Sequence, residues 1–191
     1  NTGELPICAS AATAAAVAWV EAGEKKSARW RSEACIAPHA LVEIADDRTA
    51  ADAAYRSLDA GTALLWRGDW VNARHLLQAL TKRADRRFGA ARGKAPKTPA
   101  EAFSRHRQQQ GLRAALLGRL LVPLTSDYSV PLRRAQDVRD ACVAAYGPPG
   151  GEDSLVSLRE LLAVISAHEW RKKGVPVPAV QGRIHPHYGV F

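Results

Sequence analysis

The stretch from Asp69 to Phe88 constrains the fold more than any other part of this sequence, because its apolar residues recur at the spacing of one helical face. Asp69 stands immediately before the stretch, at a position where an acidic side chain caps the free N–H groups of a helix. The pattern predicts an amphipathic helix that packs its apolar side against a core. The apolar positions are Trp70, Ala73, Leu76, Leu77, Leu80, Ala84 and Phe88.

Two tetrapeptides with the pattern of a capping box predict the starts of two more helices. In residues 98–101, Thr-Pro-Ala-Glu, the threonine is the N-cap and the glutamate three residues later closes the box. Residues 157–160, Ser-Leu-Arg-Glu, have the same pattern, and Gly174 is expected to end the helix that follows. The first of these helices turns apolar between Leu112 and Leu121, so its second half is expected to be buried.

The remaining predicted elements are shorter. The alanine-rich run from Ser10 to Glu24 predicts a peripheral helix. Residues 49–59 and 136–146 predict two more helices, and residues 39–44 predict a strand. Residues 62–66 are either a short strand or a lead into the next helix.

Proline positions complete the predicted organisation. Pro123 is expected to end the long helix, and residues 124–132 to form at most an edge strand or an extended loop. We therefore expect a mainly α fold, with a helical accessory domain at residues 1–174 that has a few short strands. Residues 175–191 are expected to be an extended connector, whose closing mixture of glycine, proline and apolar residues is typical of a lead into a further domain.

The net charge of +8 is concentrated in one part of the chain. Residues 66–134 hold 15 Lys and Arg but only four acidic residues, whereas the rest of the chain is slightly acidic. A one-sided positive field suits a polyanion such as RNA, because phosphate contacts need only clustered cations. A solvated basic face without a partner is the alternative. The cations expected at such a surface are Lys82, Arg83, Arg86, Arg87, Arg92, Lys94, Lys97, Arg105 and Arg107.

Composition also excludes some classes of protein. No apolar run approaches the roughly 18 residues of a membrane span, so we expect a soluble, cytoplasmic protein. Cys8, Cys35 and Cys142 are far apart and lack a Cys-x-x-Cys pair, so free thiols are expected. His185 and His187 are too few ligands for a metal site, and no metal is expected.

A family resemblance rests on residues 62–69, 99–107, 157–162, 168–175 and 182–191. With these segments the chain resembles, from about Ser27 onward, the N-terminal part of bacterial class I S-adenosylmethionine-dependent methyltransferases. The resemblance implies a Rossmann-like catalytic domain beyond Phe191, with a glycine-rich loop for S-adenosylmethionine and an Asn-Pro-Pro-aromatic motif. The only comparable run, residues 147–151, lacks the asparagine and the aromatic residue, so no catalytic residue is assigned.

For function, the resemblance implies transfer of a methyl group to RNA or to a protein of the translation apparatus, with this region recognising the substrate. The connector would then lead into the cofactor-binding domain, which puts His185, His187 and Tyr188 beside the cofactor or the substrate. Two other hypotheses stay open. One is a stand-alone basic helical module that binds nucleic acid without catalysis, and the other is a structural domain that binds a partner through its apolar C-terminal residues.

Overall fold

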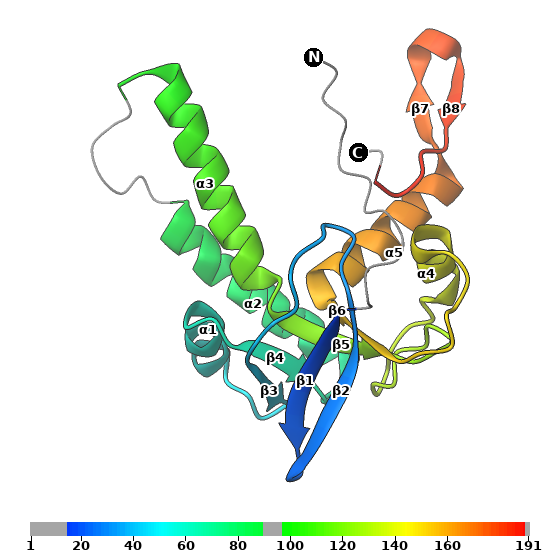
Figure 1. Cartoon of the computed structure of the whole chain (residues 1–191). Helices are drawn as coiled ribbons and strands as arrows, with labels where there is room; N and C mark the ends of the chain where they lie inside the picture. The colour runs from blue at the N-terminus through cyan, green and yellow to red at the C-terminus, as the bar shows by residue number, and fades with distance from the viewer. Residues whose placement is uncertain (1–14, 90–96, 190–191) are drawn as a thin grey trace.

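A six-stranded mixed sheet forms the centre of the protein in the computed structural model, which describes residues 15–89 and 97–189 (Figure 1). The strand order is β1-β2-β6-β5-β4-β3. The strands are β1 (Ala16–Glu21), β2 (Glu24–Arg31), β3 (Val42–Ala45), β4 (Ala63–Trp66), β5 (Leu120–Leu124) and β6 (Ser154–Ser157). The helices are α1 (Ala51–Asp59), α2 (Trp70–Phe88), α3 (Pro99–Leu117), α4 (Arg139–Tyr146) and α5 (Leu158–Lys173).

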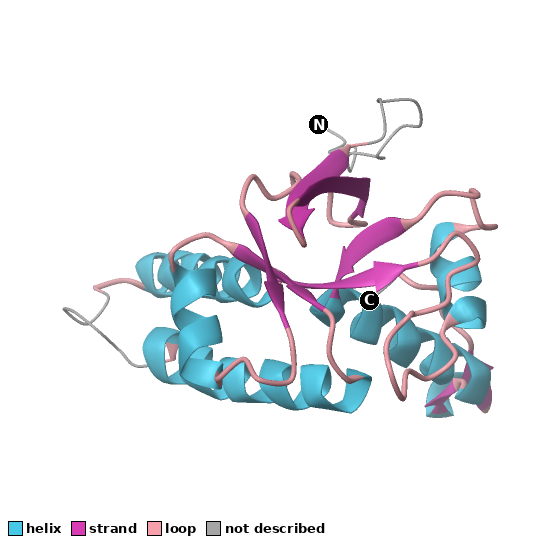
Figure 2. Cartoon of the chain, turned by 90° about the horizontal axis from the view of Figure 1, so that it is seen from below, coloured by secondary structure: helices cyan, strands magenta, loops and turns pink. Residues whose placement is uncertain are grey.

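The sheet joins a parallel and an antiparallel part. Strands β3, β4 and β5 are parallel, β6 runs antiparallel to β5, and β2 is parallel to β6 and antiparallel to β1. The sheet curls strongly, so that the edge strands β1 and β3 contact each other (Figure 2). The curled sheet therefore has an inner face, and the helices cover the outer one.

Two hydrophobic cores lie on the two faces of this sheet. The helices bury their apolar sides against the outer face, where Leu64 and Trp66 of β4 contribute. The alternate residues of the same strand, Ala63 and Leu65, join the inner core beside Trp19. Since successive side chains of a strand point to opposite faces, β4 is buried on both sides. An all-apolar strand this short gives no periodic signal, which is why residues 62–66 were ambiguous in the sequence.

The expectation of a mainly α fold is wrong, because the protein is mixed α/β around the six-stranded sheet. The predicted helix at residues 10–24 is also wrong for its described part. There Val17 and Trp19 are buried and their neighbours are exposed, which is the period of a strand. Ala22 and Gly23 both have positive φ, as a tight hairpin turn requires, and they connect β1 to β2. Sheet pairing thus overrides the helix propensity of alanine.

Pro123 does not end the long helix, which finishes at Leu117, and β5 follows as an inner strand of the sheet. An inner proline is tolerated because β4 pairs with β5 only at Leu120 and Leu121. At Pro123 the only neighbouring strand is β6. Proline has no backbone N–H, but no hydrogen bond to β4 is lost, because β4 does not reach this residue.

The helix predictions for α1, α2, α3 and α5 are confirmed within a few residues. Asp69 caps α2 by accepting a hydrogen bond from the Val71 N–H, and Thr98 caps α3 by accepting one from the Glu101 N–H. The connector folds into a small hairpin of β7 (Val175–Val177) and β8 (Gly182–Ile184), with a single 3-10 turn at Pro178–Val180 between the strands. Figure 1 shows α3 and α5 diverging from the sheet, with the β7–β8 hairpin beyond the end of α5.

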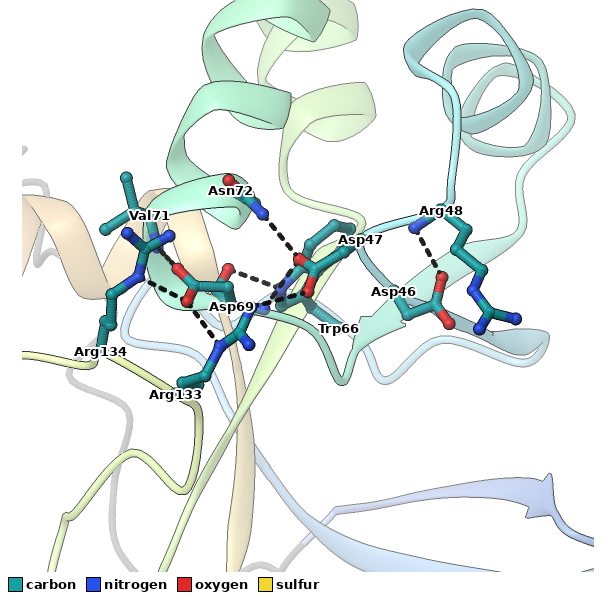
Figure 3. Close-up of polar contacts among 9 residues, drawn as sticks. All are labelled: Asp46, Asp47, Arg48, Trp66, Asp69, Val71, Asn72, Arg133 and Arg134. Atoms are coloured by element: carbon teal, nitrogen blue, oxygen red, sulfur yellow. Dashed lines mark hydrogen bonds and ion pairs between the residues drawn. The ribbon is translucent and has the colours of Figure 1, made fainter.

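The buried carboxylate of Asp69, in the turn after β4, joins the start of α2 to the loop after β5 (Figure 3). One oxygen accepts the N–H of Val71 at the start of α2, at 2.8 Å. The other accepts Nε of Arg133, at 3.0 Å, and Nε of Arg134, at 2.6 Å, from the loop after β5. The hydrogen bond from Arg134, followed by those from Val71 and Arg133, holds the pKa of the Asp69 carboxyl well below its usual range.

A second carboxylate fixes the turn between β4 and α2. Oδ1 of Asp47, just after β3, accepts the backbone N–H of Asp69 at 2.9 Å and the side-chain amide of Asn72 at 3.0 Å. The turn passes so close that a Cβ on Gly68 would lie 2.5 Å from this Oδ1 and 2.8 Å from the Asp47 backbone nitrogen. The carboxyl ends of β3 and β4 are therefore held together by side-chain hydrogen bonds to the backbone.

Replacing Asp69 tests this junction. Asp69→Asn keeps an oxygen for the helix cap but presents an N–H₂ group to the N–H groups of Arg133 and Arg134, so we expect the melting temperature at pH 7 to fall by roughly 5 °C. Because the folded-state pKa is lowered, the stabilisation is present above the unfolded value of about 3.9 and is lost as pH falls below it.

Thermal unfolding followed by circular dichroism from pH 7 to pH 3 measures both effects. Wild type should lose more stability in acid than the variant does. Glu43→Gln, at an exposed position of β3, is the matched control and should leave the melting temperature unchanged. Parallel acid curves for wild type and Asp69→Asn would contradict the assignment.

Candidate functional site

The predicted basic surface lies on the helical hairpin of α2 and α3, where the structure sorts its cations into two groups. Arg83 pairs with Asp52 of α1 at 2.8 Å, and Arg87 pairs with Asp59 at the end of the same helix. The hydrogen bond that Arg87 donates to the carboxylate of Asp59 raises the pKa of Arg87 above its ordinary value. These two arginines attach α2 to α1, so their charge is partly neutralised within the protein.

Lys82 and Arg86 form the second group. They lie on the exposed side of α2, opposite the buried stripe, and make no ion pair with any residue that the structure describes. His75 and Gln78 continue the same polar face towards the start of the helix. The outer face of α2 therefore presents cations whose hydrogen-bonding groups are available to a ligand.

The first half of α3 adds an aromatic residue to this surface. Phe103 is 62% exposed, and the guanidinium of Arg107 lies 5.8 Å from the centre of its ring. Arg105 is half-buried, and Lys97 precedes the helix, where its N–H donates to Glu101. Arg92 and Lys94 lie outside the described residues. An exposed aromatic ring under a guanidinium is a feature that can stack on an unpaired base.

The three connector residues predicted beside a cofactor or substrate are separated by the structure. Nδ1 of His185 lies 2.5 Å from the carbonyl oxygen of Arg171, so this histidine packs on the end of α5. His187 is exposed. Tyr188 is half-buried and lines a cavity, where burial and then the negative charge of Glu160 raise its pKa to about 12.

This cavity has a volume of about 520 Å³. It lies beyond the carboxyl ends of the parallel strands β2 and β6, which is where ligands bind in many α/β proteins. Its walls are the loop after β2, the last turns of α3 and the first turn of α5. The lining includes Trp30, Ile36, His39, Gly111, Ala114, Ala115, Gly118, Arg119, Ser157, Arg159, Glu160 and Tyr188.

Glu160 is held at the edge of this cavity by two donors. Its Oε1 accepts the backbone N–H of Glu33 at 3.1 Å and the hydroxyl of Tyr146 at 3.2 Å. Burial raises the pKa of its carboxyl, which the two hydrogen bonds only partly offset. The predicted capping box at residues 157–160 is therefore not formed, because its glutamate bonds to the loop after β2 and its serine makes no cap bond.

Two polar atoms in the cavity wall lack a hydrogen-bond partner within the described part of the chain. They are Oγ of Ser157, a residue that is only 7% exposed, and Nε2 of His39. Burial, and then the charge of Arg119, lowers the pKa of His39, so its imidazole is neutral at pH 7. Because neither atom has a partner, Ser157 and His39 are not bonded to each other, and the geometry is that of a binding site instead of an assembled nucleophile and base.

The two cysteines that the structure describes differ in their state. Cys35 is disulfide-bonded, so the expectation of free thiols is wrong for this residue, whereas Cys142 is free and buried. Within residues 15–89 and 97–189, no group of three or more His, Cys, Asp or Glu residues is placed to hold a metal ion. None of the helices in these residues is both long and apolar enough to cross a membrane.

Comparison of the chain with models of protein families, with curated proteins and with solved structures gives no match. The sequence identified the cations of α2 and α3 as candidates, but it missed Ser157, His39 and Glu160. The one signal for them, the second capping-box pattern, pointed to a helix start and not to a site.

Replacing Glu160 tests its environment. Because burial raises its folded-state pKa, ionisation of Glu160 destabilises the fold as pH rises above the unfolded value of about 4.3. Glu160→Gln keeps an oxygen for both hydrogen bonds and removes the charge, so the melting temperature should rise by roughly 2–4 °C at pH 7 and stay unchanged at pH 4. Calorimetric scans at the two pH values decide, with Glu152→Gln at an exposed position as control. A lower melting temperature at pH 7 would show that the charged form stabilises the fold.

Proposed function

We propose that this chain binds the phosphate backbone of an RNA along α2 and α3 and presents that RNA to a class I S-adenosylmethionine-dependent methyltransferase. The observation that carries the binding part is the pair of unneutralised cations, Lys82 and Arg86, on the outer face of α2. The methyltransferase part rests on the sequence resemblance alone. In it, S-adenosylmethionine would bind the catalytic domain that the resemblance implies.

The neighbouring ion pairs support this proposal over a basic face without a partner. Arg83 and Arg87 are tied to α1, so the hairpin has enough acidic partners to neutralise some of its cations. Lys82 and Arg86 are left without such partners among the described residues, although they lie only one position from the paired arginines. Cations that stay unpaired on a rigid helix favour contacts with phosphates, which are independent of sequence.

The aromatic residue on α3 favours RNA with unpaired bases over a uniform duplex. Proteins recognise RNA mostly at single-stranded loops, where bases stack on aromatic rings or guanidinium planes. Phe103 and Arg107 provide one of each, four residues apart on the same face of α3. Gly111, four residues further on, lines the cavity, so this face leads from the stacking residues to the cavity wall.

The proposal also concerns where the protein acts. We place the protein in the cytoplasm, where an RNA of the translation apparatus is found. Disulfides are rare in cytoplasmic proteins, so the one at Cys35 is the observation that argues against this location.

Salt-dependent RNA binding tests the surface. The variant with Lys82, Arg86 and Arg107 all replaced by Gln should bind a structured RNA roughly 10- to 100-fold more weakly at low salt. It neutralises fewer phosphates, so its binding releases fewer counterions from the RNA. The slope of log affinity against log salt should also become shallower, by up to about two or three. Fluorescence anisotropy at salt concentrations between about 50 and 200 mM measures both the affinity and its salt slope.

A charge-matched control separates a local site from a general effect of net charge. Lys25, Arg29 and Lys173 are exposed on other elements, and replacing them by Gln removes the same three charges. This control should bind with nearly the wild-type affinity and slope. An equal loss of affinity in the two triple variants, or wild-type binding that does not depend on salt, would contradict the proposal. Either result would favour a solvated basic face without a partner.

A further inference from the structure

We infer that the cavity at the start of α5 binds a small organic carboxylate, with its carboxylate group at the helix N-terminus and its apolar body between α3 and the loop after β2. The inference is independent of RNA binding. It concerns a different set of residues, although Gly111 of the cavity wall lies on the same face of α3 as Phe103 and Arg107. Four observations support it.

The first observation is a helix start that its own sequence could cap but does not. The two capping-box patterns of this chain behave differently: Thr98 accepts the Glu101 N–H at 3.2 Å, whereas Ser157 makes no cap bond. Glu160 likewise bonds to Glu33 and Tyr146 instead of returning to its own helix start. The first N–H groups of α5 are thus left to a ligand, and a helix N-terminus favours an anion.

The second observation is the pair of polar side-chain atoms without partners. Ser157 is more than nine-tenths buried and lines the cavity, and its Oγ has no hydrogen bond within the described residues. Nε2 of His39, in the loop after β2, is also buried and has no hydrogen-bond partner among the described residues. Buried polar groups are normally hydrogen-bonded, so two orphaned ones in one cavity indicate a partner that occupies it.

The third observation is the charge of the lining. Arg119 and Arg159 both line the cavity, and the charge of Arg119 contributes to the lowered pKa of His39. Within the described residues Arg119 donates one hydrogen bond, from Nη1 to the carbonyl of Leu58 at 3.0 Å, so the other donors of its guanidinium can point to a ligand. One carboxylate, Glu160, opposes these two cations. A singly charged head fits this balance better than a doubly charged phosphate, which Glu160 would repel more strongly.

The fourth observation is the shape and polarity of the remaining walls. Gly111, Ala114, Ala115 and Gly118 face the cavity from α3, and their small side chains leave the space open. No atom lies within 4 Å of a Cβ built on Gly111. Trp30, Ile36 and Tyr188 line other parts of it. The volume of about 520 Å³ is in the range of small-molecule sites, and the walls suit an apolar body.

Isothermal titration with 3-phenylpropionate tests the inference, with 3-phenylpropionamide as the neutral analogue of the same shape. For a ligand of this size we expect a dissociation constant of about 0.1–1 mM. The amide should bind at least about tenfold more weakly, because it lacks the charge that the helix start and the arginines favour. Equal binding of acid and amide, or a signal with inorganic phosphate only, would overturn the carboxylate assignment.

Three variants locate the binding. Ser157→Ala should weaken 3-phenylpropionate about five- to tenfold and leave the melting temperature nearly unchanged, since the hydroxyl has no partner to lose. Gly111→Leu should fill the cavity and abolish binding while the protein stays folded, because leucine favours helix. Glu160→Gln should strengthen binding a few-fold by removing a like charge.

The control is Ser166→Ala, at an exposed position further along α5, which should bind as wild type does. Wild-type affinity in both Ser157→Ala and Gly111→Leu would show that the acid binds elsewhere and would overturn the inference. Weaker binding of 3-phenylpropionate to Glu160→Gln would show that the site favours a ligand with a hydrogen-bond donor or a positive charge, which would also overturn the inference.

Discussion

The carboxylate of Asp69 is the interaction on which the arrangement of this protein depends. It lies at the carboxyl end of β4, is fully buried, and receives hydrogen bonds from the start of α2 and from the loop that follows β5. Through Asp47 the end of β3 is attached to the same turn. The junction thus fixes where α2 leaves the sheet, and both the hairpin of α2 and α3 and the cavity beside α3 take their positions from it.

The same junction uses the polar side chains at the carboxyl ends of β3 and β4 within the fold. Ligands of α/β proteins usually bind at this edge of the sheet. Here Asp69 is already occupied by Arg133 and Arg134, and Asp47 by Asn72 and the backbone of the turn. Their hydrogen-bonding capacity is used within the fold. The cavity lies instead beyond β2 and β6, where polar atoms are left without partners.

Local signals in the sequence predicted the helices well and the sheet poorly. The stripe after Asp69 and the cap at Thr98 are contained within one helix, so neighbouring residues suffice to identify them. Strands β4, β5 and β6 are short and buried on both faces, β4 and β5 are apolar throughout, and all three pair with distant residues. The cavity was missed for the same reason: Ser157 and His39 are far apart in sequence, and only β2 pairing with β6 brings their loops together.

Counting charges could not separate the arginines that build the hairpin from the cations that are free to bind. Successive residues of a helix are rotated by about 100°, so the paired Arg83 and Arg87 point towards α1 while Lys82 and Arg86 point away from it. The ion pairs to Asp52 and Asp59 therefore also fix the rotation of α2 about its axis. Because Arg83 and Arg87 attach α2 to α1, Lys82 and Arg86 are held on the outer surface, where a polyanion can reach them.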